Sequence, residues 1–513
     1  MGIAQILSRA QVGLAAPLVR VEVHLGSGLP GFSIVGLPAP VVRESKERVR
    51  AALAQCGFEF PAGRITVNLA PADLPKEGGR FDLAIALGIL LASAQLRSRG
   101  DLAGSEVYGE LALNGELKPV PGLLLAALQG ARLRHRLIVP VGNATEARLA
   151  GCAGLHTVAT LAEACAVIAG GPDAVPDDGH DHGYGASDPE GGLPSPLLPG
   201  DLADVRGQHQ AVRALVIAAA GGHSLLFTGS PGAGKSMLAQ RLPGLLPPLT
   251  RDEALEVAAI DSIAKRRPGV QGWGQRPFRA PHHTASAHAI VGGGRDARPG
   301  EVSLAHRGVL FLDELPEFDR RVLEALREPL ETGTVCVSRA TLRADYPADF
   351  QFLAAMNPCP CGYHGDPSGR CQCTDADLQR YRARLSGPLL DRIDLHVTMR
   401  RVEAQALLGA PGADGRAQVT SQDCRIQIAA ARERQLRRQG RLNARLDAGS
   451  LAAGCGADAD ALALLARATD RLALSARACH RVLKVARSVA DLEGSARIGT
   501  ADLAEALALR APA

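Results

Sequence analysis

A glycine-rich segment in the middle of the chain carries the residue types best suited to bind phosphate. It reads Gly229-Ser-Pro-Gly-Ala-Gly234-Lys235-Ser236 and lies between an apolar run of strand length, residues 224–228, and a helix-forming segment. Backbone N–H groups of such a loop surround phosphate oxygens, Lys235 reaches the outer phosphates, and the Ser236 hydroxyl binds Mg²⁺. We therefore predict a nucleotide site. Its residues are Gly229, Ser230, Pro231, Gly232, Ala233, Gly234, Lys235, Ser236 and Met237.

Two further apolar runs end in polar residues suited to hydrolysis. The run 308–312 ends in Asp313 and Glu314, and the run 352–356 ends in Asn357. Open α/β sheets bind ligands at the carboxyl ends of their strands. Asp313 would hold Mg²⁺ through water, Glu314 would orient or deprotonate the attacking water, and Asn357 would sense the γ-phosphate or position water. The alternative is that Asp313 and Glu314 are simply an acidic pair at the surface, at the end of a strand. We expect ATP hydrolysis as well as ATP binding.

The elements that position these residues follow from the pattern of the whole chain. Residues 171–200 contain 13 Gly or Pro and no Lys or Arg, which is typical of a flexible linker. Residues 1–170 mix short β-branched runs with helical stretches, so we expect an α+β domain. Strand-length runs alternate with helical segments over residues 201–400, which predicts a parallel sheet covered by helices. Residues 401–513 have helical periodicity and predict a C-terminal helical lid.

Composition limits the classes of protein to which the chain can belong. With 513 residues, 46% of them hydrophobic, it is long enough for about three domains. The net charge of +4 requires any polyanionic partner to be held by local basic patches. Eleven Cys without regular spacing favour a reducing compartment. The N-terminus lacks signal-peptide features and the longest apolar stretch, residues 83–94, is shorter than a membrane span, so we expect a soluble, cytoplasmic protein with no membrane contact.

Five additional stretches carry a resemblance to a known family. Together with the nucleotide motifs, they make the chain similar to the magnesium-chelatase-like AAA+ ATPases, and within that group to the ComM/YifB family. The resemblance spans nearly the whole chain. The stretches are Val205–Gln208, Phe278–Ser286, Arg298–His306, Ala325–Glu331 and Asn357–Gly362.

This resemblance implies a ring, a hexamer, with ATP bound at the seams between subunits. By matching position, Asn357 is the first sensor and Arg392 is the arginine finger that a neighbour donates to the γ-phosphate. The second sensor is an Arg of the segment 475–481, and Arg477 is preferred because it opens a helix. The alternative for each Arg is a surface salt bridge.

Residues 1–170 resemble the Lon-protease-type domain, which has a ribosomal-S5-like fold. Active Lon enzymes use a Ser nucleophile activated by Lys. Aligned without gaps on the stretches 74–83 and 109–124, the Ser position falls on Arg80 and the Lys position on Leu124. We therefore expect a binding or assembly module and no protease activity.

Two other surfaces are candidates for binding. Seven Arg lie between Arg425 and Arg445, a stripe that suits DNA phosphates or, alternatively, a solvated helix face. A second basic cluster precedes a hairpin predicted at residues 292–294, where Arg295 and Arg298 are candidate DNA contacts. The cluster itself consists of Lys265, Arg266, Arg267, Arg276 and Arg279.

The insert at residues 357–375 contains four of the eleven Cys, and His364 lies between them. Thiolates on two short loops can close a tetrahedral Zn²⁺ site, which would be structural. Reduced loop cysteines are the alternative, because the C-x-C spacing is less diagnostic than C-x₂-C. The four candidate ligands are Cys359, Cys361, Cys371 and Cys373.

The resemblance implies one function above the others. It is an ATP-driven DNA motor that acts without sequence preference as a branch-migration helicase during recombination in natural transformation. The rival is a chelatase-type ATPase that remodels a protein partner. A chelatase motor subunit is not expected to carry a Lon-like front domain, which favours the motor.

Overall fold

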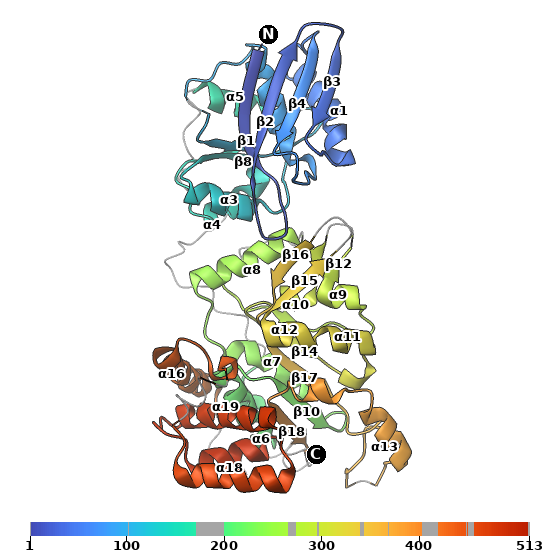
Figure 1. Cartoon of the computed structure of the whole chain (residues 1–513), viewed down its shortest axis with the longest axis vertical. Helices are drawn as coiled ribbons and strands as arrows, with labels where there is room; N and C mark the ends of the chain where they lie inside the picture. Colours follow the sequence, from blue (N-terminus) through green and yellow to red (C-terminus); the bar gives the residue numbers. More distant parts are fainter. Residues whose placement is uncertain are drawn as a thin grey trace. The chain divides into compact units, whose positions relative to one another are not determined.

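The computed structural model divides the chain into two compact units, which are considered separately here (Figure 1). The first unit comprises residues 1–192 and 254–273, and the second comprises residues 193–253 and 274–513. The structure describes residues 2–100, 102–170, 200–264, 273–294, 297–338, 343–367, 369–402, 419–447, 449 and 456–510. The predicted linker, except for Gly200, lies outside these residues.

The first unit is built on a seven-stranded mixed sheet. The strand order is β3-β4-β2-β1-β5-β8-β9; β2 pairs antiparallel with β1 and β4, and the other pairs are parallel. The strands are β1 (Gly2–Arg9), β2 (Leu18–Gly26), β3 (Gly31–Val35), β4 (Arg64–Ala70), β5 (Ser105–Val107), β8 (Arg136–Pro140) and β9 (Leu155–Val158), with a separate hairpin of β6 (Glu110–Leu111) and β7 (Leu117–Lys118). The alternating burial of β2 and β4 matches a sheet with one covered face.

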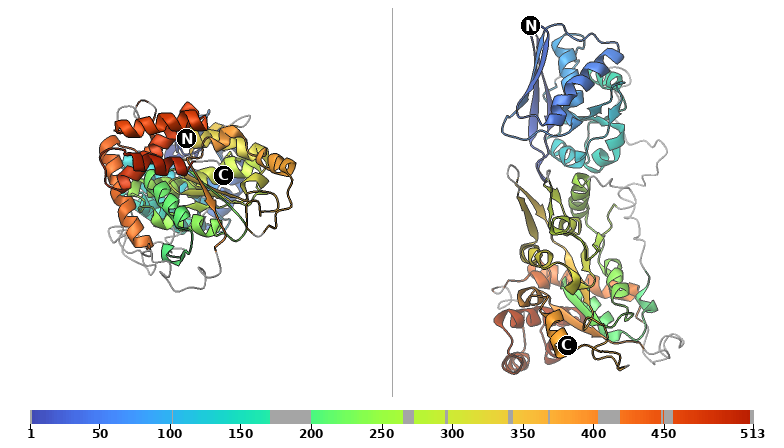
Figure 2. Two further views of the ribbon diagram at one scale, coloured as in Figure 1. Left: turned by 90° about the horizontal axis from the view of Figure 1, so that it is seen from below. Right: turned by 90° about the vertical axis from the view of Figure 1, so that its right-hand side faces the viewer.

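Helices cover this sheet, and the central one is almost wholly buried. Helix α2 packs on β1 and β2, and α1 packs on α2 (Figure 2). Residues 82–90 of α2 are all buried, as the predicted buried helix requires. The helices are α1 (Pro40–Gln55), α2 (Asp82–Ala92), α3 (Leu123–Arg132), α4 (Ala144–Leu149) and α5 (Leu161–Ala169), joined by most of α8 (Arg251–Ile263). Within the described residues, no helix is long and apolar enough to cross a bilayer.

The second unit contains a five-stranded sheet in which every pair is parallel, in the order β11-β14-β17-β10-β18. Because β10 comes first in the chain yet lies between β17 and β18, the direction of winding reverses beside it, which creates a switch point at its carboxyl end. The strands are β10 (Leu225–Gly229), β11 (Phe278–Arg279), β14 (Val309–Leu312), β17 (Gln351–Met356) and β18 (Leu395–Met399). The three strands predicted for this sheet are confirmed within one residue at each end.

Helices and two hairpins surround this sheet. The predicted helices of the C-terminal part are confirmed as α16 (Ser421–Gln439), α18 (Ala459–Leu472), α19 (Ala476–Leu492) and α20 (Thr500–Ala508). The others are α6 (His209–Gly221), α7 (Lys235–Leu245), α9 (Ala287–Val291), α10 (Glu301–Leu304), α11 (Arg320–Ala325), α12 (Arg327–Thr332), α13 (Asp375–Arg382) and α14 (Gly387–Leu390), and the hairpins are β12 (Gly292–Gly293) with β13 (Arg298–Pro299) and β15 (Thr334–Ser338) with β16 (Arg343–Pro347). A lid division at residue 400 stays a prediction.

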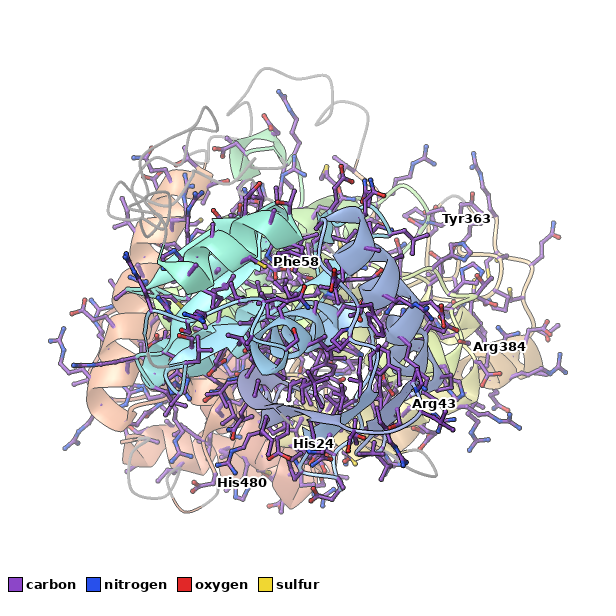
Figure 3. All side chains as sticks on the ribbon, turned by 90° about the horizontal axis from the view of Figure 1, so that it is seen from above. His24, Arg43, Phe58, Tyr363, Arg384 and His480 are labelled. Carbon is purple, nitrogen blue, oxygen red and sulfur yellow. The ribbon has the colours of Figure 1, made fainter. Side chains whose placement is uncertain are left out.

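A buried carboxylate ties the sheet to the C-terminal helices. Asp394 accepts hydrogen bonds from Arg481 of α19 at 2.5 Å and from the backbone N–H of Ser224 at 3.2 Å, and it contacts His223 at 3.3 Å. Burial alone would raise the pKa of Asp394, but these partners hold it below its ordinary value. Other charged side chains, such as those of Arg43 and Arg384, are exposed at the surface (Figure 3).

Candidate nucleotide site

The phosphate-binding loop lies between β10 and α7, as its sequence context predicts. Gly232 (φ 79°) and Gly234 (φ 91°) adopt left-handed backbone conformations that favour glycine. A Cβ atom on Gly229 would lie 2.5 Å from the carbonyl oxygen of Met399, so only glycine fits there. Helix α7 begins at Lys235, and its first N–H groups are therefore available to phosphate oxygens.

The Lys235 side chain lies in the centre of this loop and is buried. Its Nζ atom donates to the carbonyl oxygens of Gly229 at 2.6 Å and Ser230 at 3.1 Å, and to Oδ1 of Asn357 at 3.0 Å. Burial lowers the pKa of Lys235, while nearby carboxylates act in the opposite direction. The loop therefore holds the ammonium group and the predicted sensor in direct contact.

The Ser236 hydroxyl contacts the first carboxylate of β14. It donates to Oδ2 of Asp313 at 2.5 Å, and Oδ1 of Asp313 accepts from the backbone N–H of Glu314 at 2.9 Å. A hydroxyl and a carboxylate are oxygen ligands of the kind that Mg²⁺ takes in nucleotide sites. The residues present therefore fit Mg²⁺, which would neutralise charge on the phosphates.

Glu314 has an uncommon backbone conformation and contacts a histidine that the sequence did not predict. Its φ of 53° places it in the left-handed region, which is uncommon for a residue with a Cβ and is characteristic of functional sites. Its Oε2 atom lies 3.1 Å from Nδ1 of His283. The His283 ring packs on His282, with centroids 4.1 Å apart, and on the edge of Phe318. Sequence reasoning assigned no role to His283; the adjacent pair of histidines was the available signal.

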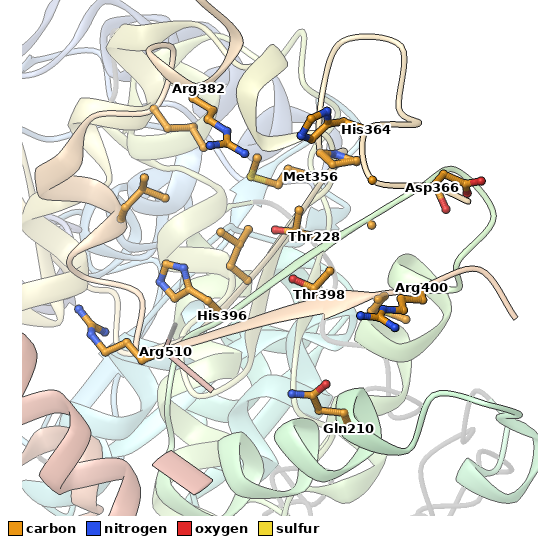
Figure 4. Close-up of a pocket in the computed structure, with 18 of the residues that line it drawn as sticks. Gln210, Thr228, Met356, His364, Asp366, Arg382, His396, Thr398, Arg400 and Arg510 are labelled. Atoms are coloured by element: carbon orange, nitrogen blue, oxygen red, sulfur yellow. The ribbon is translucent and has the colours of Figure 1, made fainter. Parts of the chain in front are cut away.

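A cavity of about 1590 Å³ opens beside the loop (Figure 4). Gly229 and Ser230 line it together with Gln208, whose Nε2 atom donates to the carbonyl oxygens of Ala233 at 3.1 Å and Arg400 at 2.7 Å. Arg382, Arg400 and Arg510 line it as well. The cavity can accommodate the rest of a nucleotide whose phosphates lie in the loop.

The predicted arginine finger is engaged within its own chain. Arg392 pairs with Glu331 through Nη2 and donates from Nη1 to the carbonyl oxygen of Pro388 at 2.6 Å. Its side chain is 10% exposed, and its buried Nε atom has no hydrogen-bond partner. Among the described residues of the same chain, the structure therefore does not bring Arg392 to the loop. Delivery to a neighbour would require the pair with Glu331 to open.

The candidate second sensor lies at the start of α19. Arg477 is exposed, and Ser475 and Ala478 beside it line the cavity. The other Arg of this segment, Arg481, is instead committed to Asp394 and to the carbonyl oxygen of Arg392. The role of Arg477 stays a prediction.

The Arg of the predicted basic stripe, which lie on α16 and on the segment after it, mostly contact other groups of the second unit. Six of its seven Arg contact carboxylates or backbone carbonyls, and Arg438 binds both oxygens of Asp491 at 2.7 and 2.9 Å. The other five are Arg432, Arg434, Arg437, Arg441 and Arg445. These contacts weigh against a continuous phosphate-binding stripe, and they also differ from the fully solvated face that was the alternative.

The second basic cluster is divided in the same way. Arg276 donates to the backbone carbonyls of Pro247 and Arg307, and Arg279 forms a bidentate pair with Glu301. The predicted hairpin is confirmed by antiparallel pairing of β12 with β13, which leaves Arg298 exposed. The remaining cluster members, Lys265, Arg266 and Arg267, lie outside the described residues, as does the candidate DNA contact Arg295.

In the first unit, the two positions that the sequence comparison predicted to align with a Ser-Lys dyad are occupied by Arg80 and Leu124. The buried Arg80 donates to Oε1 of Gln11 at 2.9 Å and to the carbonyl oxygen of Pro121 at 2.6 Å. Leu124 is fully buried in α3. Lys76 is also buried and donates to the carbonyl oxygen of Pro71, and burial lowers its pKa.

Comparison with known proteins places these features in context. Residues 201–407 match the family model "Magnesium chelatase, subunit ChlI", residues 21–143 match "Subunit ChlI of Mg-chelatase", and residues 418–510 match "Magnesium chelatase, subunit ChlI C-terminal". The competence protein ComM of Haemophilus influenzae is 46% identical over 100% of this chain and 98% of its own length. The uncharacterized protein YifB of Salmonella typhimurium is 45% identical over 100% and 97%. The magnesium-chelatase 67 kDa subunit of Heliobacterium mobile is 24% identical over 33% and 30%.

We expect Glu314→Gln to keep nucleotide binding and to lower ATP turnover by about 10²–10⁴-fold, because the amide cannot accept the proton of the attacking water. Phosphate release and the Kd of a fluorescent ATP analogue measure the two effects. Glu317→Gln is the matched control, since Glu317 pairs with Arg384 at the surface and should leave turnover unchanged. Wild-type turnover in Glu314→Gln would contradict the assignment.

We expect His283→Ala to raise basal turnover up to about fivefold, because the contact with the His283 ring, worth up to about 1 kcal/mol at a partly exposed site, no longer occupies the Glu314 carboxylate. The Kd for nucleotide should stay unchanged. The control is His282→Ala, whose ring nitrogen contacts the Thr284 hydroxyl instead. A fall in turnover in His283→Ala would show that His283 positions Glu314 for hydrolysis and would refute a restraining role.

Proposed function

Because the chain belongs to the ComM/YifB family of magnesium-chelatase-like proteins, we propose that it is an ATP-driven motor that moves along DNA without sequence preference. The observation that carries this proposal is that four polar side chains meet at one edge of the sheet. Lys235 donates a hydrogen bond to Asn357, and Ser236 donates one to Asp313. A relative named as a competence protein matches this chain over its whole length. That name supports DNA as the partner.

In this proposal each residue of the site has a defined task. Backbone N–H groups of the loop 229–237, which Pro231 lacks, and the Lys235 side chain bind the phosphates, and Ser236 and Asp313 hold Mg²⁺. Glu314 takes the proton of the attacking water. Asn357, which contacts Lys235, reports the presence of the γ-phosphate to β17 and to the segment that follows it.

We further propose that the subunits form a ring, a hexamer, with nucleotide at the seams. The proposal rests on Arg392, whose position after α14 matches the family's arginine finger, and on its contact with Glu331. An Arg supplied in trans to a transferring phosphoryl group is worth about 10³–10⁵ in rate where it has been measured in GTPases. If the Arg392 guanidinium left the Glu331 carboxylate and bound the γ-phosphate in a neighbouring subunit, ATP hydrolysis would be coupled to assembly of the ring.

The parts of the chain take separate roles in this motor. Residues 201–400 form the ATPase core, with the Cys-rich insert 357–375, and residues 401–513 form the helical lid with Arg477 as second sensor. Residues 1–170 form a Lon-like binding or assembly module without a Ser-Lys dyad. Branch migration of DNA during natural transformation is the process that we propose for the whole protein.

A chelatase-type ATPase that remodels a protein partner is the second candidate, and the descriptions of the matching family models favour it. The extent of similarity weighs against it. The magnesium-chelatase subunit matches a third of this chain, whereas the competence protein matches all of it.

The test is ATP hydrolysis with and without forked or four-way DNA across a range of salt concentrations. We expect DNA to stimulate turnover, and the stimulation to fade as salt rises, because salt removes the gain from counterion release. The affinity of the protein for DNA gives a second readout: Arg298→Ala should reduce the slope of log DNA affinity against log salt concentration by about 1. Arg380→Ala on α13 is the matched exposed control. Indifference of turnover to DNA at low salt would favour the chelatase-type function.

A further inference from the structure

Four cysteines of the insert converge on one point next to the nucleotide site. All pairs of Sγ atoms among Cys359, Cys361, Cys371 and Cys373 lie within 4.8 Å. Three of the separations are 3.2 Å for Cys359 to Cys361, 3.9 Å for Cys359 to Cys371, and 3.7 Å for Cys361 to Cys371. Nine residues of sequence separate these two pairs of thiols, whose sulfur atoms lie close together in space.

These separations match a single tetrahedral ion and no disulfide. A disulfide bond is about 2.05 Å long, much shorter than any of the three separations. Four sulfur atoms at about 2.3 Å from one Zn²⁺ form a tetrahedron whose edges are about 3.8 Å long. A cluster with several irons would need its thiolates farther apart, because they bind different metal atoms.

The local backbone also supports thiolate ligands. The backbone N–H of His364 donates to Sγ of Cys359 at 3.3 Å, an interaction that stabilises negative charge on sulfur. Gly362 adopts a φ of 85°, which turns the chain after Cys361. Tyr363, labelled in Figure 3, packs under the guanidinium of Arg370 at 5.8 Å and connects the two halves of the insert. Thiolate donors without oxygen ligands select zinc over magnesium or calcium.

The insert contacts the nucleotide site through the residues on either side of its first cysteine pair, Cys359 and Cys361. Cys359 follows Asn357 by two residues, and Asn357 contacts Lys235 at 3.0 Å. Gly362 packs on the phosphate loop so closely that a Cβ atom there would lie 2.7 Å from Cδ of Pro231. The second pair immediately precedes α13, whose start is fixed by reciprocal hydrogen bonds between Thr374 and Asp377.

We propose that the four cysteines bind one structural Zn²⁺, and that this ion braces the phosphate loop and Asn357 by tying the end of β17 to the start of α13. The ion takes no part in the chemistry, because all four of its positions are filled by protein sulfur. The metal site depends on the described thiols alone. The bracing step rests in addition on the proposed nucleotide site.

The first experiment measures metal in untagged full-length protein purified under reducing conditions without chelator. We expect about one zinc per chain by elemental analysis. The double variant Cys371→Ser with Cys373→Ser should lose it, whereas Cys56→Ser with Cys152→Ser should keep it. Wild-type protein without zinc, iron in its place, or zinc retained by the first double variant would overturn the proposal.

A second measurement on the wild type does not depend on whether that variant folds. Titration with a mercurial thiol reagent should release the zinc, followed with a zinc-binding dye, as the cluster thiols react. Release that does not accompany thiol modification would place the metal elsewhere and overturn the site.

The bracing step is tested by nucleotide affinity. Metal-free protein should bind a fluorescent ATP analogue about tenfold more weakly than the zinc form, the effect expected of a supporting shell. Gly362→Ala should keep its zinc and yet show the same weakening, because the added methyl group pushes on Pro231. Equal affinity with and without zinc would overturn the bracing alone. If wild-type protein bound no nucleotide, the nucleotide site would fail while the metal count still tested the zinc.

Discussion

The parallel alignment of β10, β14 and β17 is the constraint on which the nucleotide site depends. Thr228 pairs with Met356, and Leu312 pairs with Ala354, so the three strands end close together at one edge. The next residues along each strand are Gly229, Asp313 and Asn357. A shift of register by one residue would turn these side chains to the opposite face of the sheet. The contacts of Lys235 and Ser236 therefore follow from strand pairing as much as from the motifs themselves.

The same unit links the nucleotide site to its C-terminal helices through buried charge. Asp394 lies two residues after Arg392 and accepts from Arg481 of α19. Removing one partner of such a buried pair costs about 3–5 kcal/mol, because the other charge is left uncompensated. The pair therefore fixes α19 against the segment that carries Arg392, and movement of one should move the other. Nucleotide-dependent displacement of that segment would then reach α19 directly.

Local signals in the sequence predicted most elements that carry chemistry. The phosphate loop, the strands around it and the C-terminal helices have strong periodicity or spacing, and they are found where expected. The strand β1 and the hairpin of β15 with β16 were not predicted, because their formation depends on pairing with another strand, which no single-segment pattern reports. The acceptors of the α16 arginines were missed for the same reason: Asp491 lies 53 residues from Arg438. The contact of His283 with Glu314 likewise joins two strand ends that only the fold brings together.

Completion of each nucleotide site by a neighbouring subunit is the central claim, and mixing two inactive variants tests it most directly. Lys235→Ala subunits lack phosphate binding but retain Arg392, whereas Arg392→Ala subunits bind nucleotide but lack the finger. Each variant alone should be inactive, and the mixture should recover part of the ATP turnover, because a seam is intact where an Arg392→Ala subunit supplies the nucleotide loop and a Lys235→Ala subunit supplies Arg392. A mixture that stays inactive, or an Arg392→Ala protein that turns over ATP alone at the wild-type rate, would contradict the claim.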